Sequence, residues 1–252
     1  MKTRLILLLS IVLCPLGLSA QEEEAPKEDL APWMQKFSNL PNEKRKEFAQ
    51  HLQKAREFFA QKRIFETIDE LNKADAVFPD SPDIANMKGA CQVEFRSFDK
   101  AMEHFNKAKS LAPDNANVEF NIAEVYFVTK QWAEAASALE RVLGILEAGE
   151  EDNLMMARLI EFKIMLCKIK LGKVEEAREM AAKYDFLDDS PYPYYAEAAI
   201  AFHDEELIKA EAELARARRI FRNPAVLSPW QDTLMEFGYI KSFFGGDLED
   251  EE

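Results

Sequence analysis

Apolar residues recur along this chain in steps of three, four and three, and the pattern itself returns about every 34 residues. Steps of three and four place side chains on one face of a helix. Small residues that alternate with large ones let two helices approach closely and interlock. The four columns are Ile64, Phe98, Trp132, Val174 and Leu207; Thr67, Ala101, Ala135, Ala177 and Ala210; Leu71, Phe105, Leu139, Ala181 and Leu214; and Ala74, Ala108, Val142, Tyr184 and Ala217.

A further column, twelve residues before the small one, predicts a second helix in each unit. Pro79 and Pro113 end two of the units, because proline has no N–H with which to continue a helix. The segments PDSPD and PDNAN that begin at these prolines offer side chains that cap the next helix. Each unit is therefore predicted to be a pair of antiparallel helices. The further column is Ala55, Gly89, Ala123, Met165 and Ala198.

Two of the units carry a recognisable set of residues. They are Gly89, Phe98, Ala101, Phe105, Ala108 and Pro113 in one unit, and Ala123, Tyr126, Trp132, Ala135 and Leu139 in the next. This set resembles the tetratricopeptide repeat family over about residues 48–224. The resemblance implies an all-α fold, a right-handed α-α superhelix (solenoid) of about five helix pairs, in which stacking buries apolar faces that a single pair leaves open. After Pro224, one more helix is predicted to cap the last unit with Trp230, Leu234, Phe237 and Ile240 on one face.

One unit departs from the period. Ala135 and Ala177 are 42 residues apart, which places about eight inserted residues around 143–153. In the same unit, Met165 and Lys168 stand where the family has a small and an aromatic residue. We therefore expect the fourth helix pair to be the least regular.

The ends of the chain differ from the repeats. Residues 1–20 combine Lys2 and Arg4, an apolar run and small residues up to Ala20, the order of a cleaved secretory signal peptide. The apolar run is too short to span a bilayer, so we expect no membrane insertion after cleavage. Leu13, not a small residue, precedes Cys14, so we expect no lipoprotein. The protein is thus predicted to be exported, either periplasmic or extracellular.

Three further segments follow the signal. Residues 21–40 are predicted to be a charged disordered spacer, 41–243 the helical repeat domain and 244–252 an acidic disordered tail. Export exposes cysteines to an oxidising compartment. Cys91 and Cys167 nevertheless share a register position two units apart, too far for a disulfide, so we expect both to stay unpaired.

Composition narrows the classes of partner and reaction. The formal net charge of −14 opposes binding to nucleic acid. Three histidines lie in different units and the cysteines form no CxxC pair, so we expect neither a metal site nor a cofactor. No glycine-rich phosphate loop or GxSxG motif is present, and nothing arranges a catalytic triad. We therefore expect a protein that is not an enzyme.

What remains is a binding surface. In the family, the first helix of each pair lines the concave side of the superhelix, and this groove would be apolar and aromatic. We expect it to hold an unknown protein or extended or helical peptide, with self-assembly into a structural envelope component as the alternative. The predicted groove residues are Phe59, Phe120, Asn121, Glu124, Phe127, Phe162, Ile169, Tyr195 and Phe202.

Overall fold

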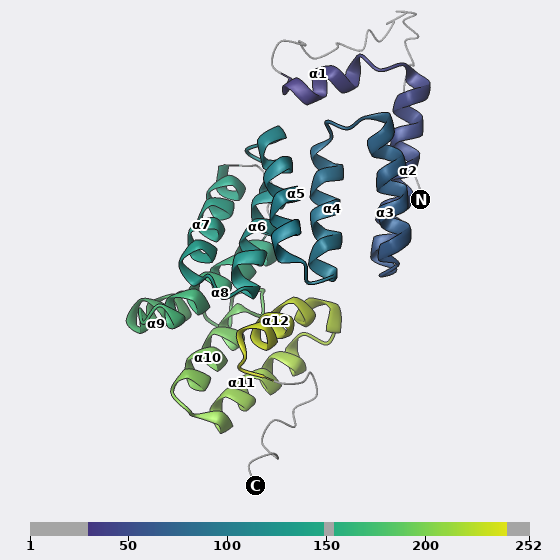
Figure 1. Cartoon of the computed structure of the whole chain (residues 1–252). Coiled ribbons are helices and arrows are strands. Elements are labelled where there is room, and N and C mark those ends of the chain that lie inside the picture. Colours follow the sequence, from purple (N-terminus) through teal and green to yellow (C-terminus); the bar gives the residue numbers. More distant parts are fainter. Residues whose placement is uncertain (1–29, 149–153, 241–252) are drawn as a thin grey trace, which may run out of the picture.

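The computed structural model describes residues 30–148 and 154–240, and in these residues the regular elements are all α-helices (Figure 1). Five antiparallel pairs, α2/α3 to α10/α11, stack into the predicted right-handed superhelix. The helices of the described residues are α1 (Pro32–Ser38), α2 (Asn42–Ala60), α3 (Ile64–Val77), α4 (Pro82–Glu94), α5 (Phe98–Leu111), α6 (Ala116–Val128), α7 (Trp132–Ala148), α8 (Leu154–Lys170), α9 (Val174–Ala181), α10 (Tyr192–His203), α11 (Leu207–Ile220) and α12 (Pro224–Phe237).

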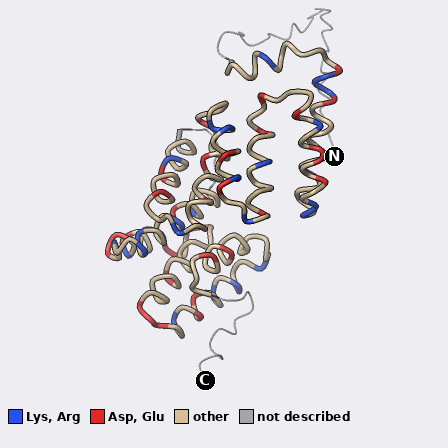
Figure 2. The backbone as a smooth tube through the Cα atoms, viewed as in Figure 1, with Lys and Arg blue, Asp and Glu red and all other residues tan. Residues whose placement is uncertain are grey.

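The inner side of the stack is formed by the first helices of the pairs. Successive first helices, α4 with α6 and α8 with α10, pack against each other more closely than successive second helices do. In a curved stack the elements nearest the axis are the most crowded, so the first helices line the concave side. Charged residues of both signs are spread over the described helices (Figure 2).

The predicted columns of small residues lie at the helix contacts. Ala55, Ala101, Ala123 and Ala135 have no exposed surface, and neither does Cys91. Cys167 is equally buried, and both cysteines are free thiols. Burial raises the pKa of the Cys91 thiol to about 11 and that of the Cys167 thiol to about 12. The buried face was therefore placed correctly at these positions, whereas Leu207 of the first predicted column is 45% exposed.

Helix starts follow the capping prediction. The Ser81 hydroxyl accepts the backbone N–H of Ile84 at the start of α4. The Asn115 side chain accepts the N–H groups of Asn117 and Val118 at the start of α6. Each cap pairs donors that the first helical turn leaves free.

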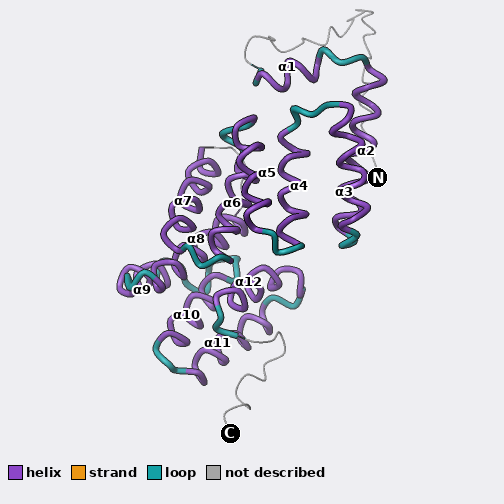
Figure 3. The backbone as a smooth tube through the Cα atoms, viewed as in Figure 1, coloured by secondary structure: helices purple, strands orange, loops and turns teal. Residues whose placement is uncertain are grey.

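A short loop joins the two helices of each pair (Figure 3), and each of these loops holds one residue in the left-handed region. The spacing of these residues repeats that of the units, so the turn is part of the repeat even though no sequence signal marks it. Four of the five are not glycine, although the left-handed region disfavours residues with a Cβ. They are Lys62 (φ 58°), Arg96 (φ 55°), Lys130 (φ 63°), Gly172 (φ 75°) and Glu205 (φ 62°).

The fourth pair is irregular, as expected, and it differs from the predicted pattern in one respect. The insertion lengthens the helices on either side of it: α7 and α8 have 17 residues each, against 13 or 14 in α3 to α6. Tyr184 was expected on the packing face of the second helix. Instead α9 ends at Ala181 after 8 residues, and Tyr184 lies in the loop before α10.

The N-terminal boundary needs a correction. Residues 32–38 form α1, so the disordered spacer predicted for 21–40 is wrong at its C-terminal end. Phe37 packs edge to face on Phe48 of α2 and on Phe78, with ring centroids 5.0 and 5.3 Å away. This aromatic cluster covers the apolar end of the first repeat. The predicted signal peptide, the start of the spacer and the acidic tail lie outside the described residues.

The last helix also takes an unexpected place. The face with Trp230, Leu234, Phe237 and Ile240 is buried, as predicted. However, α12 turns back over α8 as well as touching α11, and so covers the concave side of the last units (Figure 1). The predicted cap of the stack is therefore also a cover of the groove.

Candidate functional site: the concave groove

Polar side chains link successive first helices along the concave side. Arg56 of α2 faces Asp83 of α4, with Nη2 and Oδ2 3.5 Å apart. The Asn121 amide of α6 donates to the Asn86 side chain of α4 at 2.9 Å. Glu124, one turn beyond Asn121, pairs with α8. These amide and charged side chains lie in a row across the first helices, and a bound peptide backbone could form hydrogen bonds with them.

The predicted groove residues divide into two groups by their exposure. Phe59, Phe120, Asn121, Glu124 and Phe202 are partly exposed. Phe127, Phe162, Ile169 and Tyr195 are buried, and the three aromatic rings of this group have no exposed surface. The four buried residues therefore cannot act as open anchors for a partner in this structure.

Aromatic side chains of α12 bury these rings. Phe237 stacks on Phe127, with centroids 6.3 Å apart, and meets Trp132 edge to face at 5.5 Å. Trp230 packs on Phe162 at 5.4 Å and on Tyr195 at 5.6 Å. One helix thus contacts α6, α7, α8 and α10, which belong to three different repeat units.

A buried lysine lies at the centre of this contact. Lys163 of α8 is 2% exposed, and its Nζ lies 3.0 Å from both carboxylate oxygens of Glu124. The same Nζ lies 3.7 Å from Oε2 of Glu236 on α12 and 4.4 Å from the centre of the Phe127 ring. Two carboxylates and a π face therefore surround one cation, which compensates the cost of burying it.

This arrangement disfavours the ionised form of the Glu236 carboxyl. The Glu236 side chain is 38% exposed, and the partial loss of water raises the pKa of the carboxyl; Lys163 opposes this rise, and the negative charges of Glu124 and Asp232 add to it. Two carboxylates share one lysine, so one negative charge remains uncompensated there. The contact between α12 and the groove is therefore sensitive to charge.

The far end of α12 reaches Phe202. Tyr239 stacks on Phe202 with centroids 5.4 Å apart, and it touches Phe237 at 4.7 Å. Lys170 at the end of α8 lies 4.5 Å from the centre of the Phe237 ring. Phe202 keeps part of its surface exposed at this end. The cover thus buries Phe162 of α8 and leaves Phe202 partly exposed at its margin.

Sequence reasoning did not place α12 over the groove. Its apolar face was visible, but an apolar face does not tell which surface it meets. A usable signal was Lys163 within the apolar run IEFKIMLCKI, because a buried lysine requires acidic partners. Glu124 and Glu236 are those partners.

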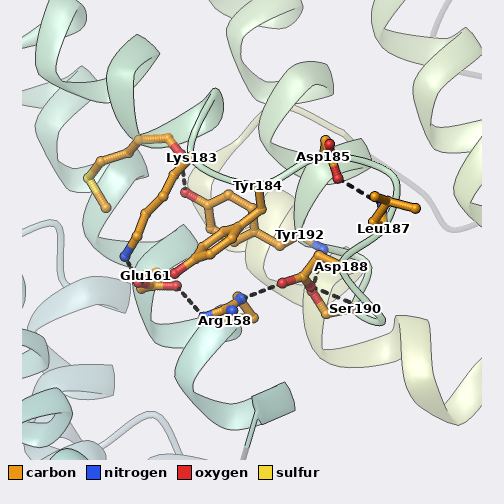
Figure 4. Close-up of polar contacts among 10 residues, drawn as sticks. Arg158, Glu161, Lys183, Tyr184, Asp185, Leu187, Asp188, Ser190 and Tyr192 are labelled. Carbon is orange, nitrogen blue, oxygen red and sulfur yellow. Dashed lines mark hydrogen bonds and ion pairs between the residues drawn. The ribbon is translucent and has the colours of Figure 1, made fainter.

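A second polar cluster lies in the loop after α9 (Figure 4). Arg158 Nε bonds Asp188 at 2.8 Å, and the Arg158 guanidinium lies 3.5 Å from the centre of the Tyr184 ring. Glu161 accepts hydrogen bonds from Lys183 and from the Tyr184 hydroxyl. These contacts replace the missing part of α9 and fix the loop, so their role is structural. The loop carries an exposed apolar pair, Phe186 and Leu187, 75% and 74% exposed.

Residues 30–148 and 154–240 hold no group of three or more histidine, cysteine or acidic side chains arranged to bind a metal ion. Among the same residues, no helix is both long and apolar enough to cross a bilayer.

The comparisons with known proteins agree with this geometry. Residues 98–148 match the family described as YpiA-like, tetratricopeptide repeats. No curated protein matches the sequence significantly. The structure is similar to that of Pseudomonas aeruginosa pilF, with a TM-score of 0.55 and 15% identity over 78% of this chain and 94% of the other.

Two further solved structures are similar at the level of the fold. YrrB, described as a TPR protein with an unusual peptide-binding site, has a TM-score of 0.50 and 15% identity over 80% of this chain and 98% of its own. TTC0263 of Thermus thermophilus, a thermophilic TPR protein, has a TM-score of 0.50 and 17% identity over 75% and 99%. The all-helical stack of five pairs and these likenesses lead to one conclusion: the chain has the fold of the tetratricopeptide-repeat proteins.

Proposed function

We propose that this protein is an exported scaffold, not an enzyme, which binds a protein or peptide in the concave groove formed by α2, α4 and α6. One observation carries the proposal: the concave side is covered by α12 over α8 and α10, whereas its N-terminal half keeps Phe59, Asn86 and Asn121 partly exposed. Partly exposed apolar rings and paired amides on one side of the stack offer both apolar contact and hydrogen bonds to an extended chain. The likeness to a protein described as having a peptide-binding site supports the class of ligand.

Export is the second part of the proposal. It rests on residues 1–20, whose basic start, apolar run and small residues have the order of a signal peptide. Cell fractionation of a C-terminally tagged chain tests it. We expect the tagged protein outside the cytoplasm, shortened by about the length of such a signal; a full-length chain confined to the cytoplasm would contradict export.

Binding is tested by quantitative capture from cell-envelope extract, with chemical crosslinking and mass spectrometry. The bait is the chain from residue 21 in three forms: unchanged, Asn86→Ala with Asn121→Ala, and Phe65→Ala. Phe65 lies on a second helix and is 74% exposed, so its removal controls for loss of any surface ring.

We expect a partner that the unchanged and Phe65→Ala chains retain and the double variant loses. Equal capture by all three forms would contradict the groove. Capture of no protein except further copies of the chain would favour the alternative, a self-assembling structural component, and sedimentation equilibrium would then show an oligomer.

A further inference from the structure

We propose that the groove lined by α6, α8 and α10 is a receptor for an amphipathic acidic helix, and that α12 is its built-in, displaceable occupant. The partner helix would present a tryptophan, and a glutamate and a phenylalanine six and seven residues later, as α12 does with Trp230, Glu236 and Phe237. This inference deepens the proposed function and rests on it, because it names a second ligand class for the same concave side.

The contacts of α12 are those of a ligand in a groove. A helix that merely continued the stack would pack on the helix before it. Instead α12 packs on α8 as well as on α11, and it places its large side chains on first helices of three units. Trp230 fills the space between Phe162 and Tyr195, and Phe237 lies between Phe127 and Trp132. Grooves that bind helices recognise them through such anchors, here two aromatic residues about two turns apart on one helix face.

The charges beside Glu236 exclude a basic side chain at the same position of a ligand. The receptor side supplies the cations Lys163 and Lys170, which lie beside Glu236 and the Phe237 ring. The occupant supplies Asp232 and Glu236. Lys163 is held by Glu124 of α6 whether or not α12 is present. Lys163 can therefore lose Glu236 while it keeps Glu124, so it is never left unpaired. Replacement of α12 by another acidic helix is electrostatically possible for this reason.

The helix itself is weak. Pro229 lies inside α12, where it has no N–H to donate to the carbonyl of Ala225. The Thr233 hydroxyl donates back to the Pro229 carbonyl at 2.7 Å, a bond that competes with regular helix geometry. Isolated helices below about 12–15 residues are marginal in water even without proline. The helical state of α12 therefore depends on the groove, and a better helix former can compete for the same place.

The test uses the full chain and a fluorescent synthetic peptide with the sequence of residues 223–240. In the unchanged chain the tethered α12 competes at an effective concentration on the order of millimolar, so the peptide should bind weakly by fluorescence anisotropy. Two variants weaken the tethered helix: Trp230→Ala removes an anchor, and Glu236→Lys places a like charge beside Lys163 without opening a cavity. We expect each to bind the peptide at least about tenfold more tightly.

A charge swap shows where the peptide binds. Lys163→Glu should abolish binding of the normal peptide in the Trp230→Ala chain, where the tethered helix keeps Glu236 and is repelled as well, and a peptide with Glu236→Lys should restore binding. Phe65→Ala should change nothing. Affinity that stays the same in both weakened chains, or that ignores Lys163, would overturn the proposal. So would loss of the folded circular-dichroism signal in both chains, because α12 would then be part of the fold and not a displaceable occupant.

The outcomes also separate this inference from the proposed function. Peptide binding to α6, α8 and α10 has its own readout, independent of capture through Asn86 and Asn121. If capture holds and the peptide fails, only the displaceable helix is wrong. If the peptide binds and capture from extract fails, the scaffold function of the open half is wrong.

Discussion

Gly89 of α4 lies against the ring of Phe105 in α5 so closely that a Cβ at residue 89 would be 2.5 Å from Phe105 Cε1. Phe105 is itself 1% exposed, so the ring has no free space into which to turn. The Phe105 ring thus fits only because Gly89 has no side chain opposite it. The alternation of small and large residues in the repeat therefore sets how closely two helices can pack.

Gly89→Ala should therefore destabilise the protein. We expect the free energy of unfolding to fall by about 1–3 kcal/mol, the usual cost of overpacking. Gly144→Ala is the matched control, because nothing lies within 4 Å of a Cβ there and alanine favours helix; it should add about 0.5–1 kcal/mol. Urea unfolding of both variants checks the pair. Equal effects would mean that the close approach is not needed.

Arg96→Gly should stabilise the second unit. Arg96 has φ 55° and an exposed side chain, and the left-handed region costs a residue with a Cβ about 1–2 kcal/mol. Glycine removes that strain but loses more backbone conformational entropy on folding than arginine does. We therefore expect the free energy of unfolding, measured in urea, to rise by about 1 kcal/mol or less. The converse control is Gly172→Ala at the same turn of the fourth unit, which should destabilise. A gain from both substitutions would contradict the argument.

The repeat was predictable because its physics is local and recurs. Ala101 and Ala135 are 34 residues apart and occupy equivalent helix contacts in successive units, so the pattern of small and large residues appears once in each unit. The caps at Ser81 and Asn115 follow from a side-chain oxygen before each helix. The left-handed turn residues carry no such mark, since lysine, arginine and glutamate occupy them.

The groove was only half predictable for a similar reason. Asn121 and Glu124 were predicted on the concave side from their spacing, and the structure pairs them with Asn86 and Lys163 of the neighbouring first helices. Spacing fixes the face of a helix but not what covers that face. The cover, Trp230 and Phe237, comes from a single helix that has no second copy to reveal its partner surface.

Glu236→Gln should make the protein more stable at neutral pH. The folded-state pKa of Glu236 is raised, so the folded state prefers the protonated carboxyl. The stability that this group contributes is present below its ordinary pKa and is lost as the pH rises through the raised value. Glutamine keeps the neutral form at every pH. We expect the variant to exceed the unchanged protein in urea unfolding at pH 7 and the difference to shrink towards pH 4.

Glu47→Gln is the control for that experiment. Glu47 is exposed, and its hydrogen bond with Lys44 lowers its pKa, so its change should have the opposite sign and a small size. A difference at Glu236 that stays constant from pH 7 to pH 4 would show that desolvation of this carboxyl is not the cause.

Pro229→Ala should strengthen α12. The substitution restores an N–H for the Ala225 carbonyl, and Pro229 is exposed, so little packing is lost. Proline inside a helix costs about 3 kcal/mol, part of which the stiffer unfolded chain offsets, so we expect a gain of about 1–2 kcal/mol. In the full chain the same substitution should also weaken binding of the 223–240 peptide. Thermal unfolding and anisotropy measure the two effects; tighter peptide binding would contradict the competition.

Phe127→Ala distinguishes a core ring from an exposed anchor. Phe127 has no exposed surface and touches Trp132, Lys163 and Phe237, so its removal should cost about 3–5 kcal/mol in urea unfolding. Phe59→Ala is the matched change on the open half, where the ring is partly exposed, and should cost about 1 kcal/mol while reducing partner capture. An exposed anchor at residue 127 would lose the partner and keep its stability. That result would mean that α12 leaves this part of the groove open in solution. The expected result is the large loss of stability, because Phe127 is buried and packs against Phe237.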